Sequence, residues 1–161
     1  MFKVKTGLGT DSHRFCEEAL PDRPLILGGV EWEEALSLSG NSDADVVLHA
    51  LTDAISSITG KTIIGQRADQ LCQEGITNSS EYLKLALADL APFEISNVAL
   101  TLECKQPKID PKVAKMRASI AALLGIDVDS VGITATSGEA LSAVGRGEGI
   151  YCQALVTAIL T

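Results

Sequence analysis

The chain has 161 residues, of which 46% are hydrophobic, 21% charged and only 4% aromatic. This length and composition predict a single globular domain over residues 1–161 and exclude a coiled-coil rod and a disordered tail. The net charge of −8 argues against nucleic-acid and anionic-membrane partners, which need a basic surface. Phosphorylated small molecules remain possible ligands, because a bound metal ion reverses the sign of the local charge.

The four cysteines lack the spacing of a zinc ribbon or of a secreted disulfide framework. We interpret them as small buried side chains in a reducing compartment. The first residues carry no apolar run typical of a signal peptide, and the longest apolar stretch, residues 154–160, is too short to span a membrane. A cytoplasmic protein is therefore expected.

Hydrophobic periodicity predicts strands that alternate with helices. A first strand covers residues 2–8 and is closed by Gly9, and a hairpin follows at residues 25–27 and 30–32. A helix is expected from Ser42, which resembles a capping box with Asp45, to about Ser57. Residues 60–73 show no clear pattern.

A second helix is expected from Ser79 or Ser80 to near Pro92, followed by a strand at residues 98–104. A third helix starts at Asp110-Pro111 and stops at Gly125. Strands are predicted at residues 131–135 and 149–161, the last one apolar on both faces. The fold class is thus α/β or α+β, with one main sheet and about three helices.

The two histidines suggest a metal site. His13 follows Asp11 by two residues, and His49 lies on one helix face with Asp45 and Asp53. Asp11, His13 and His49 could supply three ligands to one ion and leave a fourth position open, as in catalytic zinc sites. Asp45 or Asp53 would then accept a hydrogen bond from the other ring nitrogen of His49 and so fix its tautomer. The alternative is two ordinary histidines on unrelated surfaces, because nothing local brings them together.

Three further clusters have the chemistry of phosphate binding. Hydroxyls and a glycine occur in residues 134–139, where Glu139 could hold Mg²⁺. Arg146 lies between glycines and can offer a bidentate fork to a phosphate or carboxylate. Residues 105–108 form a small basic loop that could meet a nucleotide. Each cluster also has an alternative without a ligand. Residues 134–139 could be a plain strand-to-turn junction, Arg146 could pair with a glutamate in a flexible turn, and residues 105–108 could be a solvated turn.

Several blocks of the sequence occur in the order of one known family. They are Gly9-x-Asp-x-His-Arg-Phe15, Ile26-Leu-Gly-Gly-Val30, Ser42-Asp-x-Asp-Val-x-x-His-Ala-Leu-Thr-Asp53, Pro107-Lys108, Ala135-Thr-Ser-x-Glu139 and Gly145-Arg-Gly-Glu-Gly-Ile150. Through them, the chain resembles the 2-C-methyl-D-erythritol 2,4-cyclodiphosphate synthase family over almost its whole length. The blocks at 42–53 and 145–149 are the most specific.

The resemblance implies an α+β fold, with a mixed four-stranded sheet packed on helices, and a homotrimer with active sites between subunits. It implies a phosphorus–oxygen lyase that cyclises 4-diphosphocytidyl-2-C-methyl-D-erythritol 2-phosphate and releases CMP. A divalent metal, zinc in the first instance, is expected at Asp11, His13 and His49. Mg²⁺ or Mn²⁺ is expected to bridge the diphosphate near Glu139.

The resemblance also assigns roles to further residues. It implies that Ser137 and Asn41 act in catalysis, and that Arg146 and Glu148 line the mouth of a channel in the trimer. The substrate-binding residues that it implies are Asp11, His13, Asn41, Ser42, Gly65, Cys104, Lys105, Pro107, Lys108, Ile109, Ala135, Thr136, Ser137, Glu139 and Arg146.

The chain departs from the family pattern at several positions. Asn41 replaces a histidine and cannot carry its positive charge. Ile63 stands where an aspartate that binds the erythritol hydroxyls is expected, and Asp69 is the candidate substitute. Ala143 and Gln153 replace a channel phenylalanine and glutamate. An active, divergent synthase is the main hypothesis. The alternatives are a non-catalytic paralogue that binds CDP and metal, a metal-dependent phosphohydrolase and a purely structural trimer.

Overall fold

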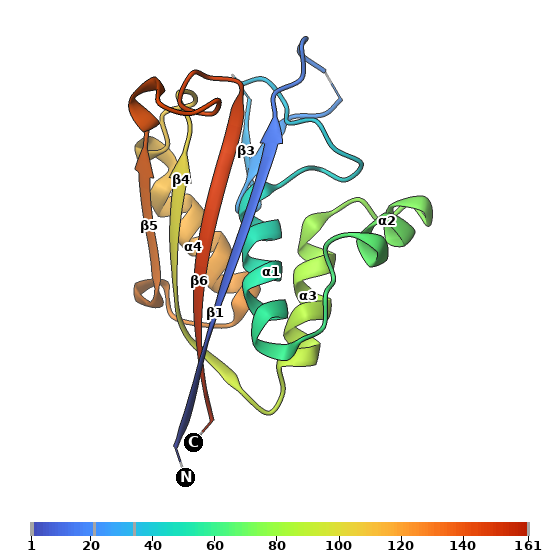
Figure 1. The fold of residues 1–161 in the computed structure, drawn as a ribbon, viewed down its shortest axis with the longest axis vertical. Coiled ribbons are helices and arrows are strands. Elements are labelled where there is room, and N and C mark those ends of the chain that lie inside the picture. Colours follow the sequence, from blue (N-terminus) through green and yellow to red (C-terminus); the bar gives the residue numbers. More distant parts are fainter. Residues whose placement is uncertain (1, 21, 34, 161) are drawn as a thin grey trace.

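A computed structural model describes residues 2–20, 22–33 and 35–160, which form one mixed sheet, a small hairpin and four helices (Figure 1). The two longest strands, β1 (Lys3–Arg14) and β6 (Gly149–Leu160), pair antiparallel over their whole length. β4 (Glu94–Glu103) pairs antiparallel with β6 and parallel with β5 (Val131–Thr136), which gives the order β1-β6-β4-β5. This confirms the mixed four-stranded sheet. β2 (Leu25–Leu27) and β3 (Val30–Trp32) form the hairpin.

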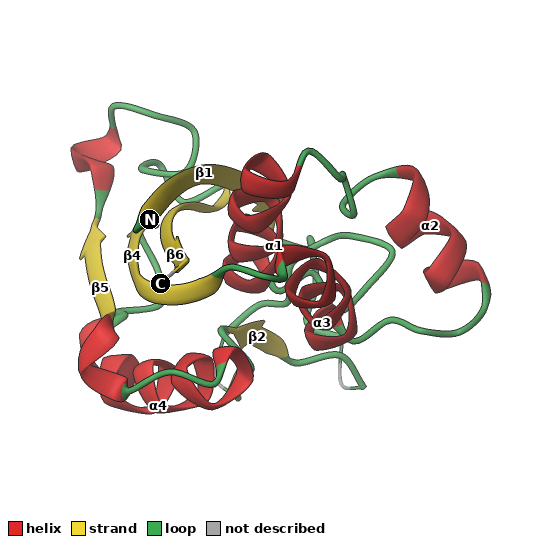
Figure 2. Cartoon of the chain, turned by 90° about the horizontal axis from the view of Figure 1, so that it is seen from below, coloured by secondary structure: helices red, strands yellow, loops and turns green. Residues whose placement is uncertain are grey.

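Three helices pack beside the sheet, and one stands apart from it. α1 (Val46–Thr59) and α4 (Val113–Leu124) pack on one side of the sheet and α3 (Ser79–Leu90) packs on α1, whereas α2 (Gln66–Gln73) projects away from the sheet (Figures 1 and 2). Short 3₁₀ turns occur at Asp110–Lys112, Val128–Ser130 and Gly138–Ala140. Within the described residues, every helix is too short or too polar to cross a lipid bilayer.

Alternation along the central strands places one face of the sheet in the core. Val98 and Leu100 of β4 are buried, whereas Ala99 between them is exposed. β6 follows the same rule, because Ala154 is buried and Leu155 is 41% exposed. The expectation that both faces of the last strand are covered is therefore wrong for the single chain, since the helices cover only one.

Two glycines let α1 lie directly against β1. A Cβ atom at Gly7 would collide with the carbonyl oxygen of Ala54, and one at Gly9 with that of Ala50. The expectation that Gly9 closes the first strand is therefore wrong, because β1 continues to Arg14. This contact fixes the distance between the end of β1 and the first turn of α1.

The helix starts also differ from the predicted ones. Asp45, and not Ser42, caps α1, because its carboxylate accepts from the amides of Val47 and Leu48. Asn78 caps α3 through the amide of Ser80. The third predicted helix begins with a 3₁₀ turn at residues 110–112 and becomes α-helical from residue 113. The fourth helix, α2, lies in the segment that has no clear pattern.

The strand directions bring three strand ends to the same end of the sheet. β1, β4 and β5 run parallel to one another, because β1 and β4 are both antiparallel to β6 and β4 is parallel to β5. Their carboxyl ends lie at the top of Figure 1, and the two ends of the chain lie together at the bottom. The residues that the sequence singles out around positions 11–13, 104–109 and 135–137 are therefore all at the top.

Candidate active site

The structure brings Asp11, His13 and His49 together at the junction of β1 and α1. Asp11 and His13 alternate along β1 on its inner side, and His49 lies in the first turn of α1. Asp11 Oδ2 is 3.0 Å from both His13 Nε2 and His49 Nδ1, and these two nitrogens are 3.3 Å apart. One ligand atom from each residue lies within 4.8 Å of the others. The packing of α1 on β1 thus supplies the proximity that sequence spacing does not enforce.

The hydrogen-bond partner of His13 determines which of its ring nitrogens faces the cluster. His13 Nδ1 is 2.7 Å from the carbonyl oxygen of Ser39, which can only accept a hydrogen bond. His13 therefore carries a proton on Nδ1, and Nε2 is the ring nitrogen that faces Asp11 and is available to a metal ion. One carboxylate and two imidazoles are a typical ligand set for a divalent metal ion such as zinc. The donor chemistry of these residues fits such an ion.

The ionisation of Asp11 and His13 is coupled. Burial alone would raise the pKa of Asp11, but hydrogen bonds and charge from His13 and His49 outweigh it and hold the pKa below its usual range. The hydrogen bond to Asp11 raises the pKa of His13, although burial opposes the shift. The site therefore favours a positive charge beside Asp11, which a proton or a metal ion can supply.

The ring of His49 is held differently from the sequence prediction. His49 Nε2 lies 2.8 Å from Ser79 Oγ and 3.3 Å from Ser42 Oγ. The carboxylate of Asp45 is occupied elsewhere: besides capping α1, it accepts from the amides at residues 28 and 29 in the turn between β2 and β3. Asp53 is half-buried and close enough for the charges of Asp11 and His49 to affect its pKa, which burial raises. Ser79 thus takes the place expected for an aspartate.

The loop before α1 is held by an arginine that the sequence analysis does not single out. Arg23 Nη2 donates to the carbonyl oxygens of Gly40 and Ser42, at 2.8 and 2.7 Å. Between these two residues, the side chain of Asn41 is exposed. An arginine just before a predicted strand gives no signal of such a role, because the loop that it binds is 17 or more residues away.

The residues expected around the nucleotide line one hollow between the ends of β4 and β5. Its volume is about 140 Å³. Burial raises the pKa of Cys104 to about 11, so its thiol stays neutral at physiological pH. Lys105 is exposed and lies outside this lining. The lining residues are Cys104, Pro107, Lys108, Ile109, Asp110, Ala135, Thr136 and Ser137.

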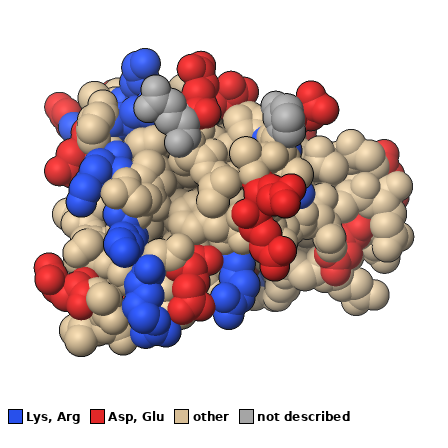
Figure 3. Space-filling model, turned by 90° about the horizontal axis from the view of Figure 1, so that it is seen from above, with Lys and Arg blue, Asp and Glu red and all other residues tan. Residues whose placement is uncertain are grey.

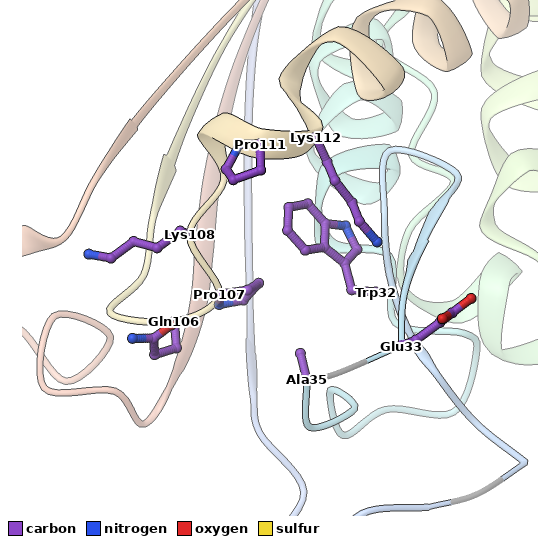
Figure 4. Close-up of a pocket in the computed structure, with 8 residues that line it drawn as sticks. All are labelled: Trp32, Glu33, Ala35, Gln106, Pro107, Lys108, Pro111 and Lys112. Carbon is purple, nitrogen blue, oxygen red and sulfur yellow. The ribbon is translucent and has the colours of Figure 1, made fainter.

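A larger hollow of about 470 Å³ lies on the other side of Pro107. Trp32, Pro111 and Lys112 contribute to its walls, and the side chain of Lys108 points away from the indole (Figure 4). The two hollows share the loop at residues 107–108, but only the smaller one includes residues 135–137. Figure 3 shows the same end of the molecule from above, where Lys and Arg side chains gather on the side of β4 and β5 despite the negative net charge.

The turn after β5 carries the remaining charged candidates. Glu139 is exposed, and its backbone has a positive φ of 48°. Arg146 Nη2 is 3.3 Å from Glu148 Oε1, and the other carboxylate oxygen of Glu148 is 3.0 Å from Arg14 Nη1. Arg146 therefore shares its anionic partner with a second arginine at the end of β1.

The segment expected to depart from the family pattern, residues 61–69, is mostly exposed, but Ile63 and Ala68 are buried and Ile64 is half-buried. Ile63 is 1% exposed and packs in the core, so it is unavailable to a ligand. Gly65, with φ of 116°, precedes α2, and Asp69 is exposed on that helix. A hollow beside α2 is lined by Thr62, Gln66, Arg67 and Gln70.

Comparisons with known proteins agree with this arrangement. Residues 4–159 match the YgbB family. A 2-C-methyl-D-erythritol 2,4-cyclodiphosphate synthase from Chlamydia muridarum is 46% identical over 155 residues, which cover 95% of this chain and 86% of the relative. A protein of the same name from Chlamydia felis is 48% identical, with 95% and 88% coverage. A solved 2C-methyl-D-erythritol-2,4-cyclodiphosphate synthase in its CDP-bound form gives a TM-score of 0.82 at 27% identity, with 96% and 99% coverage.

Proposed function

Because the chain belongs to the YgbB family, we propose that it is a phosphorus–oxygen lyase of non-mevalonate isoprenoid biosynthesis. It converts 4-diphosphocytidyl-2-C-methyl-D-erythritol 2-phosphate to 2-C-methyl-D-erythritol 2,4-cyclodiphosphate and CMP. The observation that carries the proposal is the Asp11, His13 and His49 cluster, at the same end of the sheet as the hollow lined by residues 104–110 and 135–137.

The reaction joins two negatively charged groups within one molecule. An oxygen of the 2-phosphate attacks the β-phosphorus, the bond from that phosphorus to the CMP oxygen breaks, and CMP leaves with the electron pair. When bound, a divalent ion at Asp11, His13 and His49, zinc in our proposal, would neutralise the diphosphate, and Mg²⁺ or Mn²⁺ at Glu139 would do the same where CMP leaves. Such reactions depend on positioning and charge neutralisation more than on a covalent intermediate.

The residues of the chain orient the substrate. The hollow between β4 and β5 suits the cytidine end, because it offers the hydroxyls of Thr136 and Ser137 beside the ammonium of Lys108. Ser137 and Asn41 are proposed to donate hydrogen bonds to phosphate oxygens in the transition state. Free cysteines throughout the chain support our proposal of a cytoplasmic location.

We also propose a homotrimer with sites shared between subunits. The metal cluster lies on β1 and the nucleotide hollow beside β5, which are opposite edges of the sheet. A neighbouring copy can bring its β5 edge to the β1 edge of the first, which closes a ring. The uncovered sheet face supports association, because Leu8 and Leu155 on it are 53% and 41% exposed. A monomer in sedimentation equilibrium would contradict this arrangement.

Phosphorus NMR of the purified protein with the cytidyl diphosphate substrate, Zn²⁺ and Mg²⁺ tests the reaction. The expected result is CMP together with two mutually coupled resonances of a cyclic diphosphate. A linear phosphate product would instead indicate a phosphohydrolase. Unchanged substrate with broadened resonances would indicate binding without turnover and would overturn the proposal.

A further inference from the structure

Ser79, the first residue of α3, connects the metal cluster to a helix that supplies none of its three ligand atoms. Ser79 Oγ lies 2.8 Å from Nε2 of His49, whose other ring nitrogen faces Asp11. The same hydroxyl contacts the carboxylate of Asp43, which also accepts from the Ser79 amide at 3.0 Å. Ser79 is fully buried and His49 is only 6% exposed, so bulk water has little access to these bonds.

The direction of each bond follows from the carboxylate of Asp43. A carboxylate only accepts hydrogen bonds, so the hydroxyl of Ser79 donates its single proton to Asp43. The oxygen of Ser79 then has only lone pairs to offer to His49, and the ring must donate from Nε2. Nδ1 of this ring lies 3.0 Å from Asp11, to which it can only donate while no ion is bound. When a metal ion takes the place of that proton, the proton on Nε2 leaves the lone pair of Nδ1 free to bind the ion.

His13 has the opposite arrangement. Its Nδ1 donates to the carbonyl oxygen of Ser39, and its Nε2 faces Asp11. The two rings therefore turn different nitrogens toward the same point, and a different partner behind each ring fixes the choice. The partner of His13 is backbone, whereas the partner of His49 is a side chain that a substitution can remove.

We propose that Ser79 and Asp43 are positioning residues that hold His49 as the Nε2–H tautomer, with Nδ1 aimed at the bound ion. The proposal goes beyond the ligand set, and it rests on the proposed function in that Asp11, His13 and His49 bind a divalent metal. It makes the first turn of α3 part of the metal site. Partners of this kind typically change metal affinity about 10–100-fold.

Two variants of neighbouring residues separate positioning from helix stability. Ser79→Ala removes the hydroxyl between Asp43 and His49. Asn78→Ala is the matched control, because Asn78 caps the same helix end through the amide of Ser80. Zn²⁺ affinity, measured by competition with a chelator, is expected to fall about 10–100-fold in Ser79→Ala and to stay within about twofold of wild type in Asn78→Ala.

The possible results are distinguishable. If wild type binds Zn²⁺ and Ser79→Ala binds it equally well, the positioning role is overturned while the proposed metal site stands. Equal losses in both variants also overturn it, because the stability of α3 would then explain the effect. A wild-type protein that binds no Zn²⁺ overturns the proposed metal site itself.

A second measurement does not depend on any variant. The chain has only two histidines, so labelling histidine with ¹⁵N gives one set of ring signals for each. In the Zn²⁺-loaded protein, the proton is expected on Nε2 of His49 and on Nδ1 of His13, because a ring nitrogen that binds the ion cannot carry a proton. A His49 proton on Nδ1 overturns the proposal, even if Ser79→Ala fails to fold.

Discussion

α1 carries a residue of the proposed site, whereas α2 projects away from the sheet, and the two helices are held in place very differently. α1 buries ten of its 14 residues, and the side chain of Asp45 caps its N-terminus. α2 has eight residues, buries only Ala68 and follows Gly65, which offers no side-chain cap. The first helix is fixed by packing on β1, whereas the second has little burial to hold it.

This difference indicates where the chain tolerates change. The tight packing of α1 fixes the position of the metal-binding side chain of His49. Substitutions on this helix therefore disturb the geometry of the metal site as well as its chemistry. Most side chains on α2 are exposed, so we expect substitutions there to disturb the structure less. The predictions below compare these two regions.

The largest effect is expected for His49→Ala on α1. Loss of one of three ligands should abolish stoichiometric Zn²⁺ binding and lower the rate of CMP release by roughly 10³-fold or more. Far-UV circular dichroism should still report the native helix content. Full activity of this variant after chelation would show that the ligand assignment is wrong.

A glycine on β1 should matter more than a glycine at the end of α2. Gly9→Ala places a methyl group against the backbone of α1 at Ala50 and should destabilise the fold by about 1–3 kcal/mol. It should also weaken Zn²⁺ binding, because α1 must shift away from Asp11 and His13. Gly75→Ala meets no neighbouring atom, so the strain of its φ of 86° should cost only about 1 kcal/mol and leave Zn²⁺ binding unchanged. Equal metal affinities in both variants would contradict the packing argument.

The buried cap of α1 should give the stability a distinct pH dependence. Burial raises the pKa of Asp45 to about 6 in the folded state, although amide hydrogen bonds from Gly29 and Gly28 oppose the shift. The folded protein therefore binds this proton more tightly than the unfolded chain does, where the pKa is near 3.8. The resulting stabilisation is complete below about pH 4 and is lost as the pH rises through about 6.

Asp45→Asn removes this contribution. The stability of wild type relative to the variant should fall by up to about 3 kcal/mol between pH 4 and 7. Urea unfolding at several pH values measures the difference, with Asp69→Asn on the exposed face of α2 as the matched control. A relative stability that rises with pH would mean that Asp45 is charged more easily in the folded state.

The smallest effect is expected for Arg67→Ala on α2. The side chain is exposed beside the hollow at residues 62–70, so stability should change by less than about 0.5 kcal/mol. If α2 holds the erythritol end of the substrate, KM should rise about tenfold while kcat stays constant, as for loss of uniform binding. Zn²⁺ affinity should not change. Steady-state kinetics that show a lower kcat and an unaltered KM would exclude this role.

Much of the fold can be predicted from the sequence, because the local residue patterns of these strands and helices agree with how they pack in the tertiary structure. The alternation of apolar and polar residues in β4 matches a strand with one buried and one exposed face. Pro111 and Gly125 mark the two ends of the third predicted helix, as such residues commonly do. α2 could not be predicted, since it is only eight residues long, is mostly polar and buries a single alanine, so it offers too few apolar positions to indicate a helix. Gly9 was expected to end a strand, but it serves the close approach of α1, which is a long-range cause.

The candidate site divides in the same way. The ligand trio follows from rare residue types and from the order of the blocks, so it is accessible from the sequence. The partner of His49 is not, because Ser79 at the start of a helix looks like an ordinary cap. Asp45 was expected to reach the ring, but the turn between β2 and β3 binds its carboxylate instead.

The pairing of β1 with β6 brings the first and last strands of the chain, and so its two ends, next to each other. Lys3 lies opposite Leu160, and both ends of the chain are at the opposite end of the sheet from the proposed site (Figure 1). A short linker between these ends, with new ends opened at the exposed Gly75, would give a circular permutant that keeps every strand intact. A tag or a surface anchor attached at the original ends would likewise leave the top of the sheet accessible to substrate.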